Sequence, residues 1–464
     1  MPSQLSKDAQ TRDMPITLYK PQQSVLDQLK EEGYPSKLLA LPTNFGKTLT
    51  LLSLLASDKE ALTPALVIAP KRVSETSWTD DIEKLDVDLT YQLFDARKQK
   101  RADMKASKDV DVLFTSVHNF QQAAPLIEKG HFKTLIIDEV DLMKSTTSAR
   151  WKAARKLRKH FTRCWGMTGT AVPSDLTTLW GMTYLIDEGK TFGTRRIQDF
   201  ITRFFIPGHS LPSGVVVSYK EKEGARDEML SMLASMSIVR KTDESQLVTY
   251  AVHKHDLKMS EEQKELYKSA MNESIQLIKK PGDSRDDLEQ KLLESTSAKV
   301  SIMRQLTSGF QMEDGDAGTA QWADTKKLDA LRYVFAGEPL LIFFQYIAER
   351  DAILKVLDEE GISYTTVQDK DAVDKWNNRK VSCFVSHPAS ISHGMNLQFG
   401  GSTVVWMSLP ATYSIFHQGN MRLARKGQLE KVDVHMLRYT CTLEDVRATR
   451  WAKQKAGNDW LLDQ

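Results

Sequence analysis

Cysteine is scarce in this chain: the 464 residues include only Cys164, Cys383 and Cys441. These three lie far apart in the sequence and form no C-x-x-C pair, so the pattern suggests neither a zinc knuckle nor a disulfide framework. So few thiols fit a protein that works in a reducing cytoplasm.

Long apolar runs and a strong excess of one charge are also missing. No apolar run approaches the ~18 residues of a membrane span, and no contact with a membrane is expected. Residues 1–15 lack the apolar core of a signal peptide, and we expect them to be frayed. Lysine and arginine total 63 and the acidic residues 61, a net charge of +2. Any contact with nucleic acid must therefore come from local basic patches.

The most informative stretch is LPTNFGKTLTLLSLLA, residues 41–56. The apolar residues 38–41 predict a buried strand, and the apolar run after Gly46, Lys47 and Thr48 predicts a helix. A strand, a tight loop and a helix that begins with Gly-Lys-Thr are the context of a phosphate-binding P-loop. Backbone N–H groups there would face a polyphosphate. Lys47 would contact its β- and γ-phosphates, and the Thr48 hydroxyl would bind Mg²⁺.

Three further apolar runs, at residues 65–70, 111–116 and 134–139, predict strands separated by helical stretches. Such βαβ units build a parallel sheet. The third run ends in Asp138 and Glu139, and open α/β sheets bind ligands at the carboxyl ends of their strands. We expect Asp138 to hold Mg²⁺ through water and Glu139 to polarise the attacking water.

Two segments of the chain have a different character. Residues 150–163 are strongly basic; a solvated helix face explains them, and a surface that faces DNA is the alternative. Residues 187–330 are less regular. Within them, Pro207, Gly208, Pro212 and Gly214 mark a loop, and residues 260–312 are charged and typical of helices.

A second α/β domain is predicted near the end of the chain, where Arg422 and Arg425 follow the last strand. The two arginines are three residues apart, so a helix would put both on one face. An arginine from a neighbouring domain can stabilise charge that develops on a transferred phosphoryl group. The strands of this domain are predicted from the apolar runs at residues 339–346, 362–367, 381–386 and 403–408.

The order of these motifs resembles that of a superfamily-two helicase core, and within that class the Swi/Snf-like DNA translocases of the small phage and bacterial type. LYKPQ, with Gln22, resembles the adenine-reading Q motif, LPTNFGKT the Walker A motif, and IIDEVD the Walker B motif. Counterparts of the family's other motifs lie at residues 67–85, 114–120, 167–180, 342–364, 392–410 and 417–428.

The resemblance implies an α/β protein of two RecA-like lobes, each a parallel sheet with flanking helices, plus helical insertions. Lobe 1 would span residues 16–245. Lobe 2 would span residues 246–464, with an insertion at about 260–325 and a C-terminal helix. ATP and Mg²⁺ would bind to lobe 1, and the arginine pair would complete the site when the lobes close.

The resemblance also assigns residues to roles. Those assigned to catalysis are Lys47, Asp138, Glu139, Arg422 and Arg425, with Thr48 and Asp138 at the metal. Those assigned to the nucleotide are Gln22, Thr43, Asn44, Phe45, Gly46, Lys47, Thr48, Gly394, Asn396 and Gln418.

The implied function is a DNA-stimulated ATPase that moves along duplex DNA without regard to base sequence. It would act as a monomer in the cytoplasm, which is the host's if a phage encodes the protein. Lys71, Arg72, Thr115 and Ser116 are the candidate contacts with DNA phosphates, which would make binding salt-dependent.

Three alternatives stay open: a helicase that separates strands, a relative that acts on RNA, and a catalytically inactive DNA-binding scaffold. The intact P-loop lysine, acid pair and arginine pair argue against the scaffold.

Overall fold

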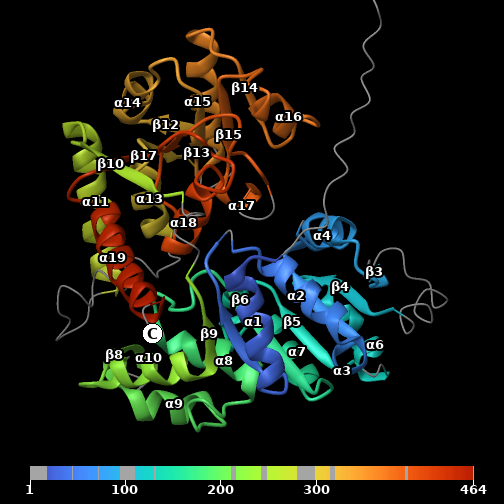
Figure 1. Cartoon of the computed structure of the whole chain (residues 1–464). Helices are drawn as coiled ribbons and strands as arrows, with labels where there is room; N and C mark the ends of the chain where they lie inside the picture. The colour runs from blue at the N-terminus through green and yellow to red at the C-terminus, as the bar shows by residue number, and fades with distance from the viewer. Residues whose placement is uncertain are drawn as a thin grey trace, which may run out of the picture. The chain divides into compact units, whose positions relative to one another are not determined.

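The computed structural model describes residues 18–43, 45–71, 73–94, 110–129, 132–210, 216–241, 248–278, 298–313, 319–391 and 395–462. In this part of the chain, helices flank two parallel sheets (Figure 1), which confirms the predicted α/β class. The chain divides into two compact units. Unit 1 contains Met1–Lys37, Phe45–Glu139 and Thr147–Met167, and unit 2 contains Leu38–Asn44, Val140–Thr146 and Thr168–Gln464.

The first sheet has seven strands. In spatial order they are β3 (Tyr91–Leu93), β4 (Val112–Ser116), β2 (Ala65–Ala69), β5 (Thr134–Ile137), β6 (Arg163–Thr168), β1 (Lys37–Ala40) and β9 (Ser237–Val239). Every residue of β2, β4 and β5 is buried. This is expected of inner strands in a parallel sheet, whose two faces are both covered, and it explains why these strands are continuous apolar runs.

The helices of this region follow the spacing of its apolar residues. In the basic stretch, Ser148 accepts a hydrogen bond from the N–H of Trp151 at 3.2 Å and so begins a helix. Trp151, Ala154 and Leu157 are buried, while Lys156 is exposed, as a solvated helix face predicts. The α-helices are α1 (Lys20–Glu31), α2 (Lys47–Ser57), α3 (Lys59–Leu62), α4 (Trp78–Leu85), α6 (Ala124–Lys129), α7 (Ala149–Arg158), α8 (Leu179–Asp187), α9 (Ile197–Phe204) and α10 (Ala225–Met236). Short π- or 3₁₀-helical turns are η1 (Val73–Ser77), η2 (Phe120–Ala123), η3 (Val140–Met143) and η4 (Leu176–Thr178).

The predicted loop is wrong at Pro207 and Gly208, because both residues lie inside a strand, while Pro212 and Gly214 lie outside the described residues. They belong to β7 (Phe205–Ser210), which pairs with β8 (Val216–Glu221) in an antiparallel hairpin. The pairing shifts register at Pro207 and His209. Proline is tolerated in a strand at such irregularities, where its missing N–H interrupts no regular ladder.

The second sheet has six parallel strands, and its core lies on both faces. Leu341 and Phe343 pack on one face with Trp406, and Leu340 and Ile342 pack on the other. Successive side chains of a strand point to opposite faces, so one continuous apolar run fills both. In spatial order the strands are β10 (Tyr250–Leu257), β17 (Val432–Tyr439), β16 (Thr403–Trp406), β13 (Leu340–Phe343), β15 (Cys383–Ser386) and β14 (Tyr364–Thr366).

Eight helices and a hairpin accompany this sheet among the described residues. The helices are α11 (Glu261–Ile278), α13 (Ala298–Leu306), α14 (Lys326–Val334), α15 (Ile347–Glu359), α16 (Ala372–Asn377), α17 (Pro388–Ile391), α18 (Tyr413–Asn420) and α19 (Leu443–Leu462). The hairpin pairs β11 (Phe310–Met312) with β12 (Ala320–Trp322). None of the described helices has both the length and the apolar character needed to cross a bilayer.

Helix α19 is fixed at both ends within unit 2. At its start, Glu444 forms a buried ion pair with Lys327 of α14 at 3.0 Å, and both side chains are 2% exposed. Removing one partner of such a pair costs about 3–5 kcal/mol, because a buried charge is left alone. Near its end, the Asn458 side chain accepts from the N–H of Val172 at 3.0 Å and donates to the same residue's carbonyl at 3.1 Å. These contacts at both ends fix the rotation of α19 about its own axis within unit 2.

Candidate functional site

The P-loop glycine has a backbone that other residues rarely adopt. Gly46 has a φ of 81° and precedes α2. A Cβ at this position would collide with the Gln22 amide and would be strained by the left-handed backbone. The N–H and the hydroxyl of Thr50 both donate to the Gly46 carbonyl at 3.0 Å. This bonding fixes the first turn of α2, and the start of a helix is a position that favours anions.

Gln22 holds the P-loop through its side-chain amide. Its Nε2 donates to the carbonyl of Phe45 at 3.0 Å and lies 3.4 Å from that of Gly46, while its Oε1 accepts from the N–H of Tyr19 at 3.1 Å. The Tyr19 hydroxyl donates to the same Phe45 carbonyl. A contact of Gln22 with adenine stays a prediction, since this amide bonds the loop backbone here.

The other predicted nucleotide residues of the loop have different surroundings. The Phe45 ring is fully buried and lies edge-on to Tyr19, with 5.9 Å between ring centroids. Only the backbone of Phe45 is therefore placed to meet a ligand. Lys47, Thr48 and Thr43 are half-buried. Asn44 lies outside the described residues.

Asp138 is positioned by a tryptophan that is distant in sequence. The indole Nε1 of Trp78 donates to Asp138 Oδ2 at 3.1 Å, and the two side chains are 0% and 7% exposed. Trp78 is the first residue of α4, and α2 packs against α4. The helix that follows the P-loop and the carboxylate that follows β5 are therefore fixed through the same helix. Trp78 was not predicted as a site residue, although its segment was recognised as a motif.

Glu139 has a strained backbone at the end of the same strand. Its φ is 54°, in the left-handed region, and it is not a glycine. Such a conformation costs on the order of 1–3 kcal/mol and persists where the surrounding structure enforces it, often at functional sites. This backbone changes the direction of the chain directly after Asp138, at the end of β5.

Replacing Trp78 with phenylalanine should increase the Mg²⁺ concentration needed for half-maximal hydrolysis. The aromatic packing is largely kept, but Asp138 loses the donor that orients it. Loss of an outer-shell partner of a metal ligand typically costs about 10–100-fold in metal affinity or activity. A Mg²⁺ titration of ATPase activity measures this effect. Trp165→Phe is the matched control, because that buried indole donates at 2.9 Å to the Pro35 carbonyl instead. Equal Mg²⁺ dependence in the two variants would show that Trp78 does not position the acid.

The predicted DNA contacts differ in their exposure. Lys71 is exposed and lies 3.8 Å from Glu75 in an ion pair. Thr115 and Ser116 end β4 with side chains 1% and 4% exposed, and the Ser116 hydroxyl accepts the N–H of Asn119 at 3.2 Å. A phosphate could reach these two side chains only after local rearrangement. Arg72 lies outside the described residues.

The helix predicted to carry Arg422 and Arg425 is wrong, because α18 ends at Asn420 and both arginines follow it outside any helix. Their side chains nevertheless converge: Nη1 of each lies 3.4 Å from the carbonyl oxygen of Met395. Arg422 is 6% exposed and also donates from Nε to the Gln418 carbonyl at 3.1 Å, whereas Arg425 is half-buried.

Of the remaining predicted nucleotide residues, Gln418 is buried, and its Nε2 lies 3.4 Å from Ser414 Oγ. Asn396 is exposed. Gly394 lies outside the described residues. The structure therefore brings Gln418 near the arginine pair through the Arg422 bond to its carbonyl.

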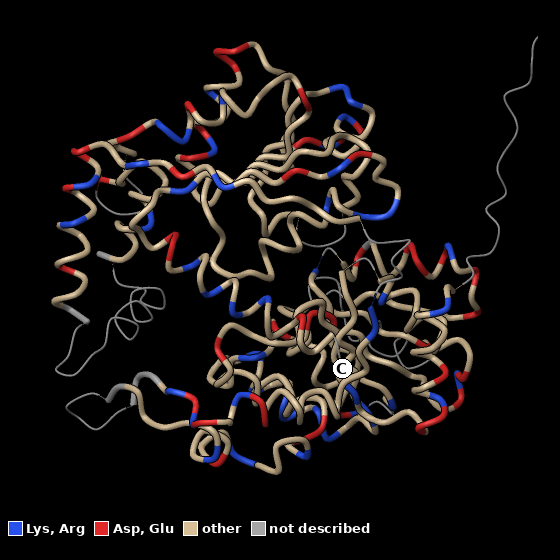
Figure 2. The backbone as a smooth tube through the Cα atoms, turned by 60° about the vertical axis from the view of Figure 1, so that its left-hand side comes forward, with Lys and Arg blue, Asp and Glu red and all other residues tan. Residues whose placement is uncertain are grey.

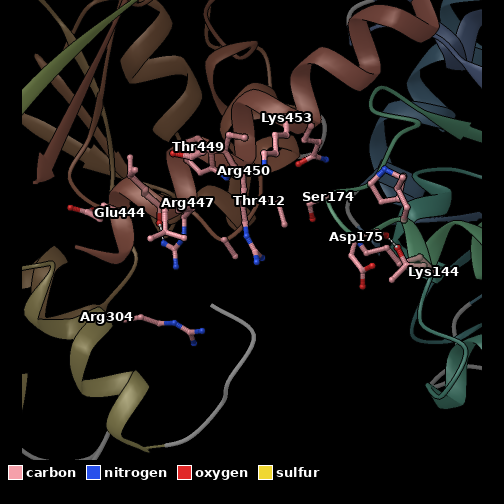
Figure 3. Close-up of a pocket in the computed structure, with 18 of the residues that line it drawn as sticks. Lys144, Ser174, Asp175, Arg304, Thr412, Glu444, Arg447, Thr449, Arg450 and Lys453 are labelled. Carbon is pink, nitrogen blue, oxygen red and sulfur yellow. Dashed lines mark hydrogen bonds between the residues drawn. The ribbon is translucent and has the colours of Figure 1, made fainter. Parts of the chain in front are cut away.

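Unit 2 also contains a large cavity that sequence reasoning did not predict (Figure 3). Its volume is about 1040 Å³. Acidic and basic residues are otherwise interspersed along the chain (Figure 2), so a lining rich in one charge is a local feature. The acidic lining residues are Asp175, Glu221 and Glu444. The basic lining residues are Lys144, Lys220, Arg226, Arg304, Arg447, Arg450 and Lys453.

The sequence also matches a known family. The model of the SNF2-related domain matches residues 25–307, more than half of the 464 residues. The chain belongs to the SNF2-related domain family. This confirms the resemblance inferred from the motifs, and it makes the chain an ATP-hydrolysing enzyme of the helicase type.

Several relatives of this SNF2-related chain are known. Protein p41 of Acyrthosiphon pisum secondary endosymbiont phage 1 is 24% identical over 445 residues, 90% of this chain and 91% of p41. An ATP-dependent helicase of Mycoplasma pneumoniae is 21% identical over 89% of this chain, which spans only 39% of that helicase. The CHD3-type chromatin-remodeling factor CHR7 of Arabidopsis thaliana is 21% identical over 88% of this chain and 34% of its own length.

Among solved structures, the Sulfolobus solfataricus SWI2/SNF2 ATPase core in complex with dsDNA is similar to this chain. The sequences are 18% identical, and the match covers 97% of this chain and 96% of that one, with a TM-score of 0.44.

Proposed function

We propose that this SNF2-related ATPase is a translocase that uses ATP hydrolysis to move along duplex DNA. The observation that carries the site assignment is the buried Trp78–Asp138 hydrogen bond, made from the helix against which α2 packs. It joins the P-loop helix and the acidic strand end into one preorganised site, and preorganisation is what phosphoryl transfer chiefly requires. The proposed setting is the cytoplasm, with the division between lobes near residues 245 and 246, between β9 and β10.

The residues present fit Mg²⁺ and a nucleotide. Mg²⁺ prefers one or two hard oxygen ligands from the protein together with phosphates, and the Thr48 hydroxyl and Asp138 carboxylate are such ligands. The left-handed backbone of Gly46, which a side chain would strain, suits close approach of phosphates. When bound, Mg²⁺ neutralises charge on the β- and γ-phosphates.

In this proposal the chain's own residues share the chemistry. Lys47 places a positive charge on the phosphates, and the N–H groups at the start of α2 donate to them. Glu139 accepts a hydrogen bond from the attacking water and orients it. The strained backbone of Glu139 supports this role, because strain is retained where a side chain must be aimed. Arg425 contributes a further charge during the cycle, and Arg422 supports the turn that carries it.

The proposal of duplex DNA as the track rests on the family and on the relatives' names, and a strand-separating helicase or an RNA-acting enzyme would share the same ATP site. Duplex DNA should stimulate hydrolysis more than single-stranded DNA or RNA. Binding should also weaken steeply with salt, because each neutralised phosphate releases condensed counterions. Steady-state ATPase rates with no polymer, duplex DNA, single-stranded DNA and RNA test this. Equal rates in all four conditions would exclude a translocase, and stimulation by RNA alone would exclude DNA as the track.

A further inference from the structure

The acidic residues of the unit 2 cavity are already engaged by other groups. Glu444 pairs with Lys327 at 3.0 Å, and its Oε2 accepts the N–H of Tyr439 at 2.8 Å. Glu221 pairs with Arg226 at 3.4 Å. Asp175 accepts the N–H of Thr177 at 2.9 Å, which caps the short helix η4. The lining nevertheless contains more cations than acids, seven against three, so its net charge is positive.

The cations of α19 follow one another along the helix. Arg447, Arg450 and Lys453 are spaced three residues apart, and residues at this spacing are neighbours on a helix surface. Figure 3 shows Arg447 and Arg450 extending into the same open space as Arg304 of α13. Between Arg447 and Lys453 the helix advances about 9 Å. Phosphates of one DNA strand follow every ~3.4 Å of the duplex axis. The row of cations is therefore long enough to contact more than one phosphate.

Two side chains in the lining could use a further hydrogen-bond acceptor. The Arg447 guanidinium donates to a neutral group, the Leu409 carbonyl, at 2.6 Å. Burial lowers the pKa of Arg447 from its ordinary value, so an anion in the cavity would stabilise its charge. Trp451 is 6% exposed, and among the described residues its indole Nε1 has no hydrogen-bond acceptor. A phosphate oxygen in the cavity would be a charged acceptor for the Arg447 guanidinium.

The lining also indicates the class of ligand. Sites for small molecules are mostly apolar and of about 300–1,000 Å³. This cavity is at the upper end of that range, at about 1040 Å³, and most of the residues that line it are charged or have a hydroxyl or amide group. Arginine is suited to phosphate because its planar fork matches two oxygens. We infer that α19, with Arg304 beside it, is a phosphate-binding surface that holds the backbone of duplex DNA. The inference rests on the proposed function and adds to it a DNA contact outside the motifs.

The test is the salt dependence of duplex DNA binding by the full chain, with Arg450→Gln and Lys453→Gln introduced singly and together. Lys453 is exposed, so its single variant should fold normally, and thermal unfolding checks each protein. Loss of one phosphate contact lowers the slope of log K against log salt by about 1. We expect a decrease of about 1 for Lys453→Gln and about 2 for the double variant. Lys455→Gln is the matched control, because Lys455 pairs with Asp459 at 2.5 Å and does not line the cavity.

The possible outcomes separate this inference from the proposed function. A lower slope in the cavity variants, with an unchanged slope in Lys455→Gln, supports the DNA contact. Wild-type slopes in the folded double variant would overturn the inference while DNA-stimulated hydrolysis stands. A slope that changes with single-stranded RNA but not with duplex DNA would also overturn it. If the wild-type chain does not bind duplex DNA at all, the proposed function itself fails.

Discussion

Glu139→Gln is expected to retain ATP binding and to lose hydrolysis by about 10²–10⁴-fold, the usual contribution of a general base. Glutamine keeps the size of the side chain and can still accept a hydrogen bond through its amide oxygen. It cannot take the proton of the attacking water, however. Nucleotide binding by calorimetry and single-turnover hydrolysis, measured on the same protein, separate the two effects.

The control for this change is Glu188→Gln. Glu188 is also an acid in a left-handed conformation, with a φ of 61°, but it is exposed after α8. Both substitutions therefore disturb a strained position equally, and only the first removes the proposed base. Lys47→Ala should differ from Glu139→Gln by weakening nucleotide binding as well as turnover, because the role proposed for the lysine is a contact with phosphates in the ground state. Wild-type turnover in Glu139→Gln or in Lys47→Ala would refute the assignment of the site.

Arg425→Ala is expected to decrease DNA-stimulated hydrolysis by about 10³–10⁵-fold, the range for an arginine that stabilises a transferred phosphoryl group. DNA binding and ATP binding should be nearly unchanged, because the charge is needed only as the transition state forms. Arg425→Lys should rescue poorly, since a point charge cannot copy the planar fork of the guanidinium. Two measurements on the same variants test this: a titration of the ATPase rate with duplex DNA, and the affinity for nucleotide.

The two arginines should not behave alike. Arg422 is 6% exposed and bonds the carbonyls of Gln418 and Met395, so Arg422→Ala should also lower the thermal unfolding midpoint. Arg379→Ala is a suitable control, because Arg379 forms a surface ion pair with Glu430 at 2.8 Å, and such pairs contribute little. A decrease of less than about tenfold for Arg425→Ala would rule out transition-state stabilisation on the proposed scale.

The sequence predicted what local patterns determine. The P-loop was predicted because its strand, glycine turn and helix are consecutive in the sequence. The inner strands were predicted because burial on both faces requires unbroken apolar runs. Strand β10 was missed for the opposite reason. It includes His253, Lys254 and His255, so it has neither an apolar run nor a clear alternation, and its place depends on pairing with β17 about 180 residues away.

Sequence spacing could not predict which side chains meet in the folded chain. Trp78 and Asp138 are 60 residues apart, and only the folded sheet brings them within a hydrogen bond. The arginine pair was predicted from helical spacing, yet its two side chains meet at the Met395 carbonyl from the segment that follows α18. The row of cations on α19 was readable in principle, since Arg447, Arg450 and Lys453 recur every three residues. The role proposed for this row could be inferred only after the structure showed that these residues line a cavity.

The bond between Trp78 and Asp138 also gives the chain an optical signal of its own. Indole fluorescence depends on the charge and hydrogen bonding at the ring nitrogen, and here that nitrogen donates directly to the carboxylate assigned to the metal. A cation that binds this carboxylate would alter the emission of Trp78, one of nine tryptophans in the chain. Subtracting the spectrum of Trp78→Phe isolates that single residue. Occupancy of the acidic end of β5 could then be followed in real time during the ATPase cycle, without a dye or a labelled nucleotide.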